Sequence, residues 1–235
     1  MVYNNTSFSI KAITVNTTHL RSEYTPFTYL IPTTHLVFEL KPERTTVHNT
    51  FTFTRKGNDA APMCLNGEHI ELKSITLNDT PLAKTDYTLD DSTLTLLNPP
   101  ANGTLKITTT CTPNTNTSLS GLFTTAAHLM TQCEAEGFRR MTYFADRPDV
   151  LSTYTVQLIG DQTAFPVLLS NGNLIESKLL DNNLHTTTWH DPFPKPSYLF
   201  ALVAGQLACL EESITQDGAN KLLQVYVEAH DLPKA

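Results

Sequence analysis

Turn-forming residues divide this chain into many short segments, and this division limits the folds that it can adopt. Asn-Gly, Asp-Gly, Asp-Asp and Pro-Pro pairs recur along the chain, often about 8–12 residues apart. The segments between them are rich in Thr, Val, Phe and Leu, which suit a pleated, half-buried surface. The sequence contains no glycine-rich phosphate loop and no alternation of strand and helix patterns. We therefore predict an all-β fold, an open, saddle-like β-sandwich of many short, mostly antiparallel strands.

Local patterns predict individual strands and turns. Residues 46–54 alternate between Thr and apolar positions, so Phe51 and Phe53 are expected to share the face that enters the core. The pairs Asn66-Gly67 and Asn171-Gly172 each predict a hairpin, because Asn and Gly accept the positive φ values of a tight turn. A third pair, Asp217-Gly218, is expected to lead into the last strand at residues 222–228.

Prolines and low-complexity segments predict where regular pairing stops. Three prolines lie in residues 191–197, which are expected to form a stiff connector between strands. Residues 198–204 are almost entirely apolar, which indicates a strand covered on both faces. Residues 112–120 are polar and repetitive, and we expect a loop without a function.

Charge and composition exclude several classes of function. With 40% apolar and 17% charged residues, the chain is typical of an ordinary globular protein. Its net charge of −7 and its lack of basic clusters argue against nucleic acid as a partner. No apolar run reaches membrane-spanning length, and the first twenty residues lack a signal-peptide pattern. The four widely spaced cysteines are expected to be free, mostly buried thiols, so we predict a cytoplasmic protein.

The most distinctive stretch is TQCEAEGFRRMTYFADRPD, residues 131–149. If it begins as a strand, Gln132, Glu134 and Glu136 point to one face, while Cys133 and Ala135 point to the other. The first face would offer an amide and two carboxylates, which suits either a bound cation or a solvated surface. After it, residues 139, 140, 146 and 147 are expected to form an ion-pair cluster beside Glu134 that supports the structure.

This stretch closely resembles the aminopeptidase N family, the zinc-dependent gluzincin aminopeptidases, and in particular its bacterial cytosolic branch. The resemblance continues through FPVLLSNGN at residues 165–173 and WHDPFPKPSYLFALVAG at residues 189–205, and it covers the chain from about residue 25 to the end. It implies that this is the family's amino-terminal β domain. In that family a Gln-x-Glu motif holds the free amino group of the peptide substrate, and these roles carry over to Gln132 and Glu134. Glu136 falls outside the motif and is expected to be solvated or structural.

The resemblance also shows what the sequence lacks. The family binds zinc through a His-Glu-x-x-His helix and a distal Glu, and none of the eight histidines here is followed by Glu. His185 and His190, the closest two, are five residues apart and would face opposite sides of a strand. We therefore expect no catalytic residue, no metal ligand and no bound cofactor in this chain, with zinc held by the full-length parent enzyme.

We interpret residues 1–24 as a polar arm or edge strand and residues 25–235 as the amino-terminal domain of a zinc aminopeptidase that releases N-terminal amino acids from peptides. This domain would recognise the α-amino group and would be inactive alone. The alternative is a stand-alone β-sandwich module that binds peptide amino termini or a partner protein, and a Thr-rich adhesive or carbohydrate-binding sandwich is a third class. Since the catalytic domain is missing, its interface would be open to water, and we expect self-association through it.

Overall fold

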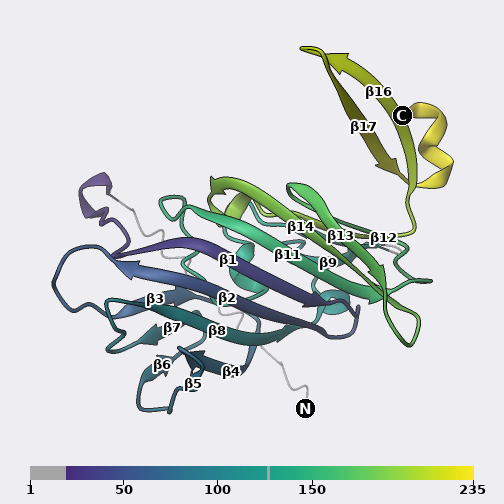
Figure 1. The fold of residues 1–235 in the computed structure, drawn as a ribbon. Helices are drawn as coiled ribbons and strands as arrows, with labels where there is room; N and C mark the ends of the chain where they lie inside the picture. The colour runs from purple at the N-terminus through teal and green to yellow at the C-terminus, as the bar shows by residue number, and fades with distance from the viewer. Residues whose placement is uncertain (1–19, 126–127) are drawn as a thin grey trace, which may run out of the picture.

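The computed structural model describes residues 20–125 and 128–235, which form 17 strands and five short 3₁₀ helices (Figure 1). The strands are arranged in four sheets, most of their pairings are antiparallel, and no sheet of the described residues closes into a barrel. The predicted all-β sandwich is therefore confirmed. The 3₁₀ helices are η1 (Arg21–Glu23), η2 (Pro113–Thr115), η3 (Phe138–Arg140), η4 (Ser197–Leu199) and η5 (Ala229–Lys234).

The largest sheet has eight strands in the order β13-β14-β11-β1-β2-β8-β4-β5. Strands β1 and β11 pair in parallel, and every other neighbouring pair in this sheet is antiparallel. The strands are β1 (Tyr29–Glu39), β2 (Thr45–Arg55), β4 (Glu71–Leu77), β5 (Thr80–Pro81), β8 (Asn102–Cys111), β11 (Ser152–Asp161), β13 (Asn173–Leu179) and β14 (Leu184–Lys195).

Three smaller sheets complete the structure. A four-stranded sheet in the order β12-β15-β10-β9 contains the start of the central sequence stretch, and another sheet has three strands in the order β3-β7-β6. The remaining sheet is the two-stranded hairpin β16-β17. The strands are β3 (Met63–Asn66), β6 (Tyr87–Leu89), β7 (Thr93–Leu96), β9 (Gly121–Thr125), β10 (His128–Gln132), β12 (Val167–Ser170), β15 (Leu202–Gly205), β16 (Ala208–Gln216) and β17 (Ala219–Val227).

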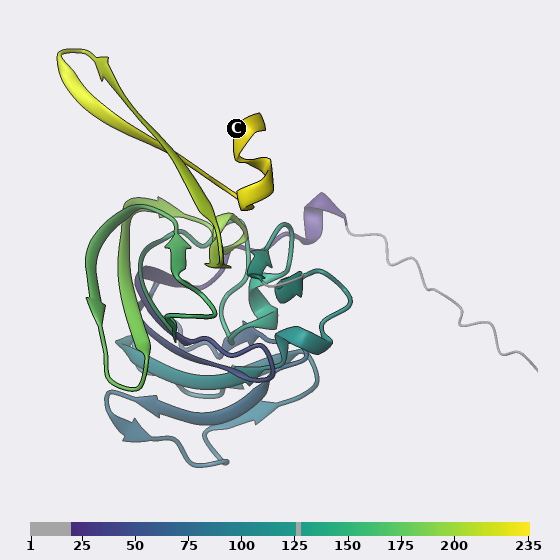
Figure 2. The ribbon, with the colours of Figure 1, turned by 90° about the vertical axis from the view of Figure 1, so that its right-hand side faces the viewer.

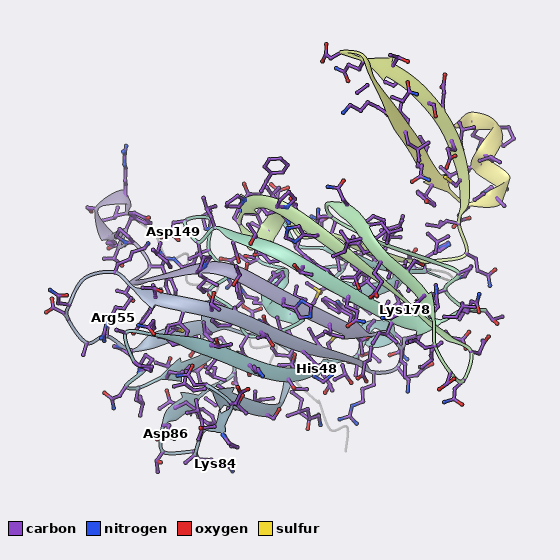
Figure 3. The ribbon with its side chains drawn as sticks, in the orientation of Figure 1. His48, Arg55, Lys84, Asp86, Asp149 and Lys178 are labelled. Atoms are coloured by element: carbon purple, nitrogen blue, oxygen red, sulfur yellow. The ribbon has the colours of Figure 1, made fainter. Side chains whose placement is uncertain are left out.

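One face of the large sheet supplies most of the core. In β2 and β11 buried and partly exposed residues alternate almost without a break, as the period of a half-buried strand requires. Phe51 and Phe53 are both buried, which confirms their predicted place in the core. The opposite face of β2 carries threonines and His48, which is labelled in Figure 3 and approaches Glu39.

The three predicted turns have different outcomes. Asp217 and Gly218 have φ values of 52° and 75° and join β16 to β17, so the predicted turn into the last strand is confirmed, and it closes a hairpin. The two hairpin predictions are wrong, because both Asn-Gly turns carry the chain from one sheet to another. Strand β3 pairs with β7 while β4 pairs with β8, and β12 pairs with β15 while β13 pairs with β14. Gly67 is needed for space, since a Cβ there would lie 2.2 Å from the ring of Tyr143.

Part of the proline-rich segment, which was expected to be a connector, forms the end of strand β14. Strand β14 continues through Pro192 and Pro194 to Lys195, and its residue Asp191 still pairs with Tyr154 of β11. Pairing with β13 ends at His190, so beyond this point β14 has an unpaired side where prolines are tolerated. Further on, only residues 202–205 of the apolar segment form a strand, and residues 197–199 form η4.

The hairpin β16-β17 projects from the sandwich, as the yellow strands at the top of Figures 1 and 2 show. Directly paired residues share a face of a sheet, and this places Leu210, Ile214, Leu223 and Val225 on the same face of the hairpin. All four side chains are exposed. Among the residues that the structure describes, no element covers this apolar face. Because an isolated two-stranded hairpin is only marginally stable, we expect that burying this face would stabilise it.

The prediction for residues 1–24 falls mainly on residues 1–19, which lie outside the described residues. Residues 21–23 form η1, so the part that can be seen is not an edge strand. Tyr24 donates a hydrogen bond to Asp149 at 3.0 Å, and the backbone N–H of Phe27 donates to the same carboxylate at 3.0 Å. Arg147 also donates to Asp149, and this interaction holds the pKa of the Asp149 carboxyl well below its usual range.

Two of the four cysteines are buried and two are exposed, which corrects the prediction that most are buried. All four are free thiols, with Cys111 and Cys133 buried and Cys64 and Cys209 exposed. Burial raises the pKa of the Cys111 thiol to about 12, and burial also raises the pKa of Cys133 above its usual value. Because the thiolate is the reactive form, the buried pair is protected by both access and ionisation.

We predict that a thiol reagent such as dithionitrobenzoate reacts quickly with two cysteines of the native chain and with all four after denaturation. Replacing Cys64 and Cys209 by Ser should abolish the fast phase, whereas replacing Cys111 should leave it unchanged. Fast reaction of a third thiol in the native chain would contradict the packing around Cys111 or Cys133.

Candidate functional site

The central stretch begins on a strand, but it leaves the strand earlier than the sequence pattern predicts. Strand β10 ends at Gln132, which pairs with Gly121 of β9, and residues 134–137 form a turn. The prediction of one polar face through Glu136 is therefore wrong, since Ala135 is exposed together with its neighbours and only Cys133 is buried. The turn is tight: a Cβ at Gly137 would lie 2.2 Å from the carbonyl oxygen of Gln132.

Gln132 and Glu134 nevertheless lie side by side at the surface. Both side chains are exposed, and the Gln132 amide donates to the backbone carbonyl of Glu134 at 3.3 Å. No hydrogen bond or ion pair within residues 20–125 and 128–235 reaches the carboxylate of Glu134. Glu136 differs, because its carboxylate lies 3.3 Å from Arg139. Among the described residues, the turn thus presents one carboxylate without a cationic partner, next to an amide that is fixed to the same loop.

A buried ion pair holds this turn against the body of the protein. Arg139 donates to the Asp146 carboxylate through Nε at 3.0 Å and through its backbone N–H at 3.2 Å, and its Nη2 donates to the Asp146 carbonyl at 3.0 Å. Ser197 also donates to the Asp146 carboxylate. The Asp146 side chain is 1% exposed. Of the four residues in the predicted cluster, only Arg139 and Asp146 pair with each other, and this pair is buried and does not involve Glu134.

Further ion pairs extend from this anchor toward the connection between β3 and β4. Arg139 lies 3.7 Å from Glu68, and Arg140 lies 3.3 Å from the same carboxylate. Arg147 pairs instead with Asp149 at 2.8 Å. The four predicted charged residues thus belong to two separate groups, each of which connects distant parts of the chain.

Residues 138–144 fill the space between the sheets. Phe138 packs against Phe144 and Phe200, with ring centroids 5.2 and 5.4 Å away. This segment is irregular, so its backbone carbonyls need donors from elsewhere. Thr109 donates to the carbonyl of Met141 at 2.7 Å, and Asn49 donates to that of Tyr143 at 3.1 Å. This need explains why Asn49 and Thr109, two polar residues of the large sheet, are buried.

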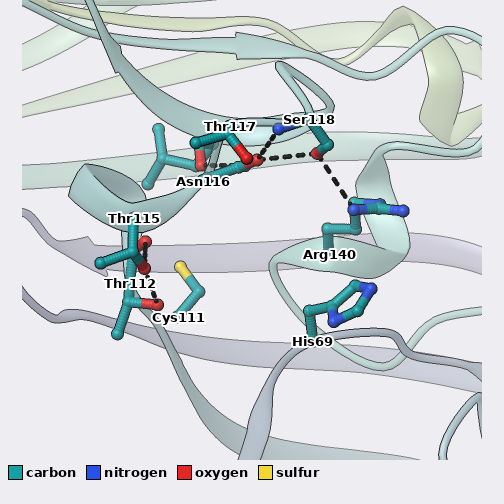
Figure 4. Close-up of a pocket in the computed structure, with 9 residues that line it drawn as sticks. His69, Cys111, Thr112, Thr115, Asn116, Thr117, Ser118 and Arg140 are labelled. Carbon is teal, nitrogen blue, oxygen red and sulfur yellow. Dashed lines mark hydrogen bonds between the residues drawn. The ribbon is translucent and has the colours of Figure 1, made fainter. Parts of the chain in front are cut away.

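A polar pocket of about 470 Å³ lies next to Arg140 of η3 (Figure 4). Its walls include Cys111, Thr115, His69 and Arg140, and Arg140 donates to Ser118 across it at 3.1 Å. Neither Gln132 nor Glu134 lines this pocket. The pocket was missed in the sequence, because the polar repetition of residues 112–120 gives no sign that the loop folds over the end of β8.

The described residues do not fit a zinc site. Within residues 20–125 and 128–235 no group of three or more His, Cys, Asp and Glu side chains could hold a metal ion. His185 is buried and shares a hydrogen bond of 2.7 Å with the carbonyl of Phe165, while His190 contacts Thr155 at 3.0 Å. These two histidines therefore have structural partners. In the same part of the chain, no helix has the length and apolarity needed to cross a membrane.

Residues 26–199 match the model of the peptidase M1 N-terminal domain, and the chain therefore belongs to this family. It is 45% identical over 215 residues to the aminopeptidase N of Caulobacter vibrioides, an alignment that spans 91% of this chain and 25% of that protein. The chain thus covers about a quarter of the length of the curated relative that it matches. The predicted resemblance to the aminopeptidase N amino-terminal domain is confirmed.

Solved structures agree with this assignment. The crystal structure of aminopeptidase A from Legionella pneumophila in complex with aspartic acid has a TM-score of 0.84 and 35% identity, over 91% of this chain and 26% of that one. An M1 zinc metallopeptidase of Deinococcus radiodurans has a TM-score of 0.71 at 16% identity, over 86% of this chain and 48% of that one, which shows a common fold. The hairpin β16-β17 lies beyond residue 199, outside the matched domain.

We predict that replacing Asp146 by Ala lowers the free energy of unfolding by about 3 kcal/mol or more, because it leaves the buried Arg139 without its main partner. Urea denaturation followed by circular dichroism measures this change. Replacing Glu136 by Ala is the matched control, since it removes an exposed partner of the same arginine and should cost about 1 kcal/mol or less. Equal losses in the two variants would contradict the role of Asp146 as the anchor.

Proposed function

We propose that this chain provides the substrate amino-terminus recognition of a zinc aminopeptidase, with Gln132 and Glu134 as the residues that hold the α-amino group. The observation that carries the proposal is the exposed carboxylate of Glu134, which no described residue pairs with, next to the amide of Gln132 on an anchored turn. The family of the chain and its similarity to an aminopeptidase N support the same function.

The chemistry of the substrate favours this arrangement. An α-amino group has a pKa of about 7.7–8.0, so near neutral pH much of it is a cation that a carboxylate binds well. Charge-assisted hydrogen bonds of this kind contribute roughly 1.5–3 kcal/mol each. Glu136 is less suitable because Arg139 already neutralises it at 3.3 Å. Holding the amino group fixes the distance from it to the peptide bond that is cleaved, which is a contribution of position.

Hydrolysis then depends on residues outside this chain. In the proposed enzyme a zinc ion held by residues outside this chain would supply the activated water, since the described residues offer no ligand set for it. We propose that the catalytic domain of the longer enzyme docks against this one, and the exposed apolar face of β16-β17 is a suitable surface because its side chains would be buried by the contact. In this division residues 25–235 carry the amino-terminal part of the enzyme and residues 1–24 precede it.

The free state of all four cysteines supports a reducing compartment, and we propose the cytoplasm. The alternative function, a stand-alone module that binds peptide amino termini, uses the same two residues and differs in affinity. A module that works alone must bind its ligand tightly with the residues it has, whereas a domain that contributes part of a pocket binds weakly.

We predict weak binding of a free alanyl peptide, with a Kd of about 1 mM or higher, visible as shifts of the backbone amide signals of residues 131–136 in NMR spectra. An acetylated peptide should cause no such shifts, because it lacks the charge. Glu134→Gln should remove the effect, and Glu136→Gln should keep it. Equal shifts with the acetylated peptide would contradict amine recognition, and micromolar affinity would favour the stand-alone module.

We also predict that the purified chain does not hydrolyse an alanine anilide, even with added zinc, because the zinc ligands and the general base are supplied elsewhere. Release of the coloured aniline measures activity, and a full-length aminopeptidase N is the positive control. Steady turnover that survives repeated purification would show that this chain contains a catalytic centre of its own.

A further inference from the structure

The two outer strands of the large sheet differ in how well they are protected. At one end lies β5, which has two residues and ends in Pro81. Short strands and prolines are ordinary means of preventing a sheet edge from pairing with another chain. At the other end lies β13, which has seven residues and no proline, and all seven side chains are exposed. No strand of the described residues pairs with its outer side.

Strand β13 also carries apolar side chains that are unusual for a free edge. Ile175 is 60% exposed and Leu179 is 69% exposed, and Leu174 and Leu180 are exposed beside them. A long, apolar edge strand offers unpaired N–H and C=O groups together with side chains that gain from burial. This combination favours the addition of another strand.

The charges on β13 identify which strand fits. Glu176 and Lys178 lie on the same face and form an ion pair at 2.9 Å; Lys178 is labelled in Figure 3. If a second copy of β13 pairs with it in the antiparallel direction, with the two copies of Ser177 opposite each other, Glu176 of each copy faces Lys178 of the other. The same register brings Ile175 next to Leu179 of the other copy. Opposite charges and aliphatic pairs in these positions stabilise a sheet.

We propose that β13 is a self-complementary edge through which two copies of this chain form a symmetric dimer with a continuous sheet. The contact is isologous, because the same strand serves both copies about a two-fold axis. It does not involve Gln132, Glu134 or the hairpin β16-β17, so it goes beyond the proposed function and does not depend on it. Since two paired strands bury less than the roughly 1,200 Å² of a stable interface, the dimer is weak and depends on concentration.

Sedimentation velocity over a range from about 10 µM to about 1 mM tests the dimer, which should be detected as a reversible species of twice 26.1 kDa. The variant Glu176→Lys brings only positive charges to the contact, and Lys178→Glu brings only negative charges. Each should raise the dissociation constant by about tenfold or more. Both positions are exposed on an edge strand, so the variants should fold, and circular dichroism checks this.

Two further samples test the proposed pairing register of the two β13 strands. The double variant E176K/K178E exchanges the charges and should dimerise like the original chain. An equimolar mixture of the two single variants should form a heterodimer, since all cross-strand pairs are then opposite in sign. A chain that stays monomeric throughout the concentration range, association unchanged in the single variants, or a mixture that does not associate would each overturn the proposal.

Discussion

The buried interaction between Arg139 and Asp146 is the constraint on which the position of the candidate site depends. It joins the turn after β10 to the segment before β11, and Ser197 connects both to the segment before β15. Removing two charges from water is costly, so a buried pair is retained only where its hydrogen bonds are nearly complete. Here Arg139 makes three hydrogen bonds to Asp146 alone. The turn that carries Glu134 is therefore anchored to the protein interior by buried hydrogen bonds, which a surface loop does not normally have.

The same region explains how an irregular segment can lie inside a β-sandwich. Phe138 and Phe144 fill the space between the sheets, while Asn49 and Thr109 satisfy the carbonyls that strand pairing leaves unmatched. Packing and polar contacts are thus combined in one segment. The result at the surface is a difference between two carboxylates only two residues apart: Glu136 forms an ion pair with Arg139, whereas no described residue forms an ion pair with Glu134.

Sequence reasoning predicted the all-β class and the buried face of β2, because these depend on local periodicity, and its assignment of Gln132 and Glu134 as site residues, which depends on a specific motif, stays a prediction. It failed where the outcome depends on partners far away in the chain. Asn66-Gly67 and Asn171-Gly172 are good turns, but their sequences do not reveal that the following strand joins a different sheet. The end of β10 at Gln132 was missed for a similar reason, since the turn is stabilised by Asp146 and by close contact with Gly121. The pocket lined by Thr115 and Arg140 likewise depends on how a loop folds back.

The tight turn at Gly137 has a consequence for how sequences of this family are compared. A side chain at this position would collide with the backbone of Gln132 and would displace the very residue that is proposed to meet a substrate. Any substitution would therefore disturb the turn that carries Gln132 and Glu134, for a purely steric reason. If this glycine proves invariant among relatives, the cause would be steric. A comparison that treats every invariant residue as catalytic would then misassign Gly137.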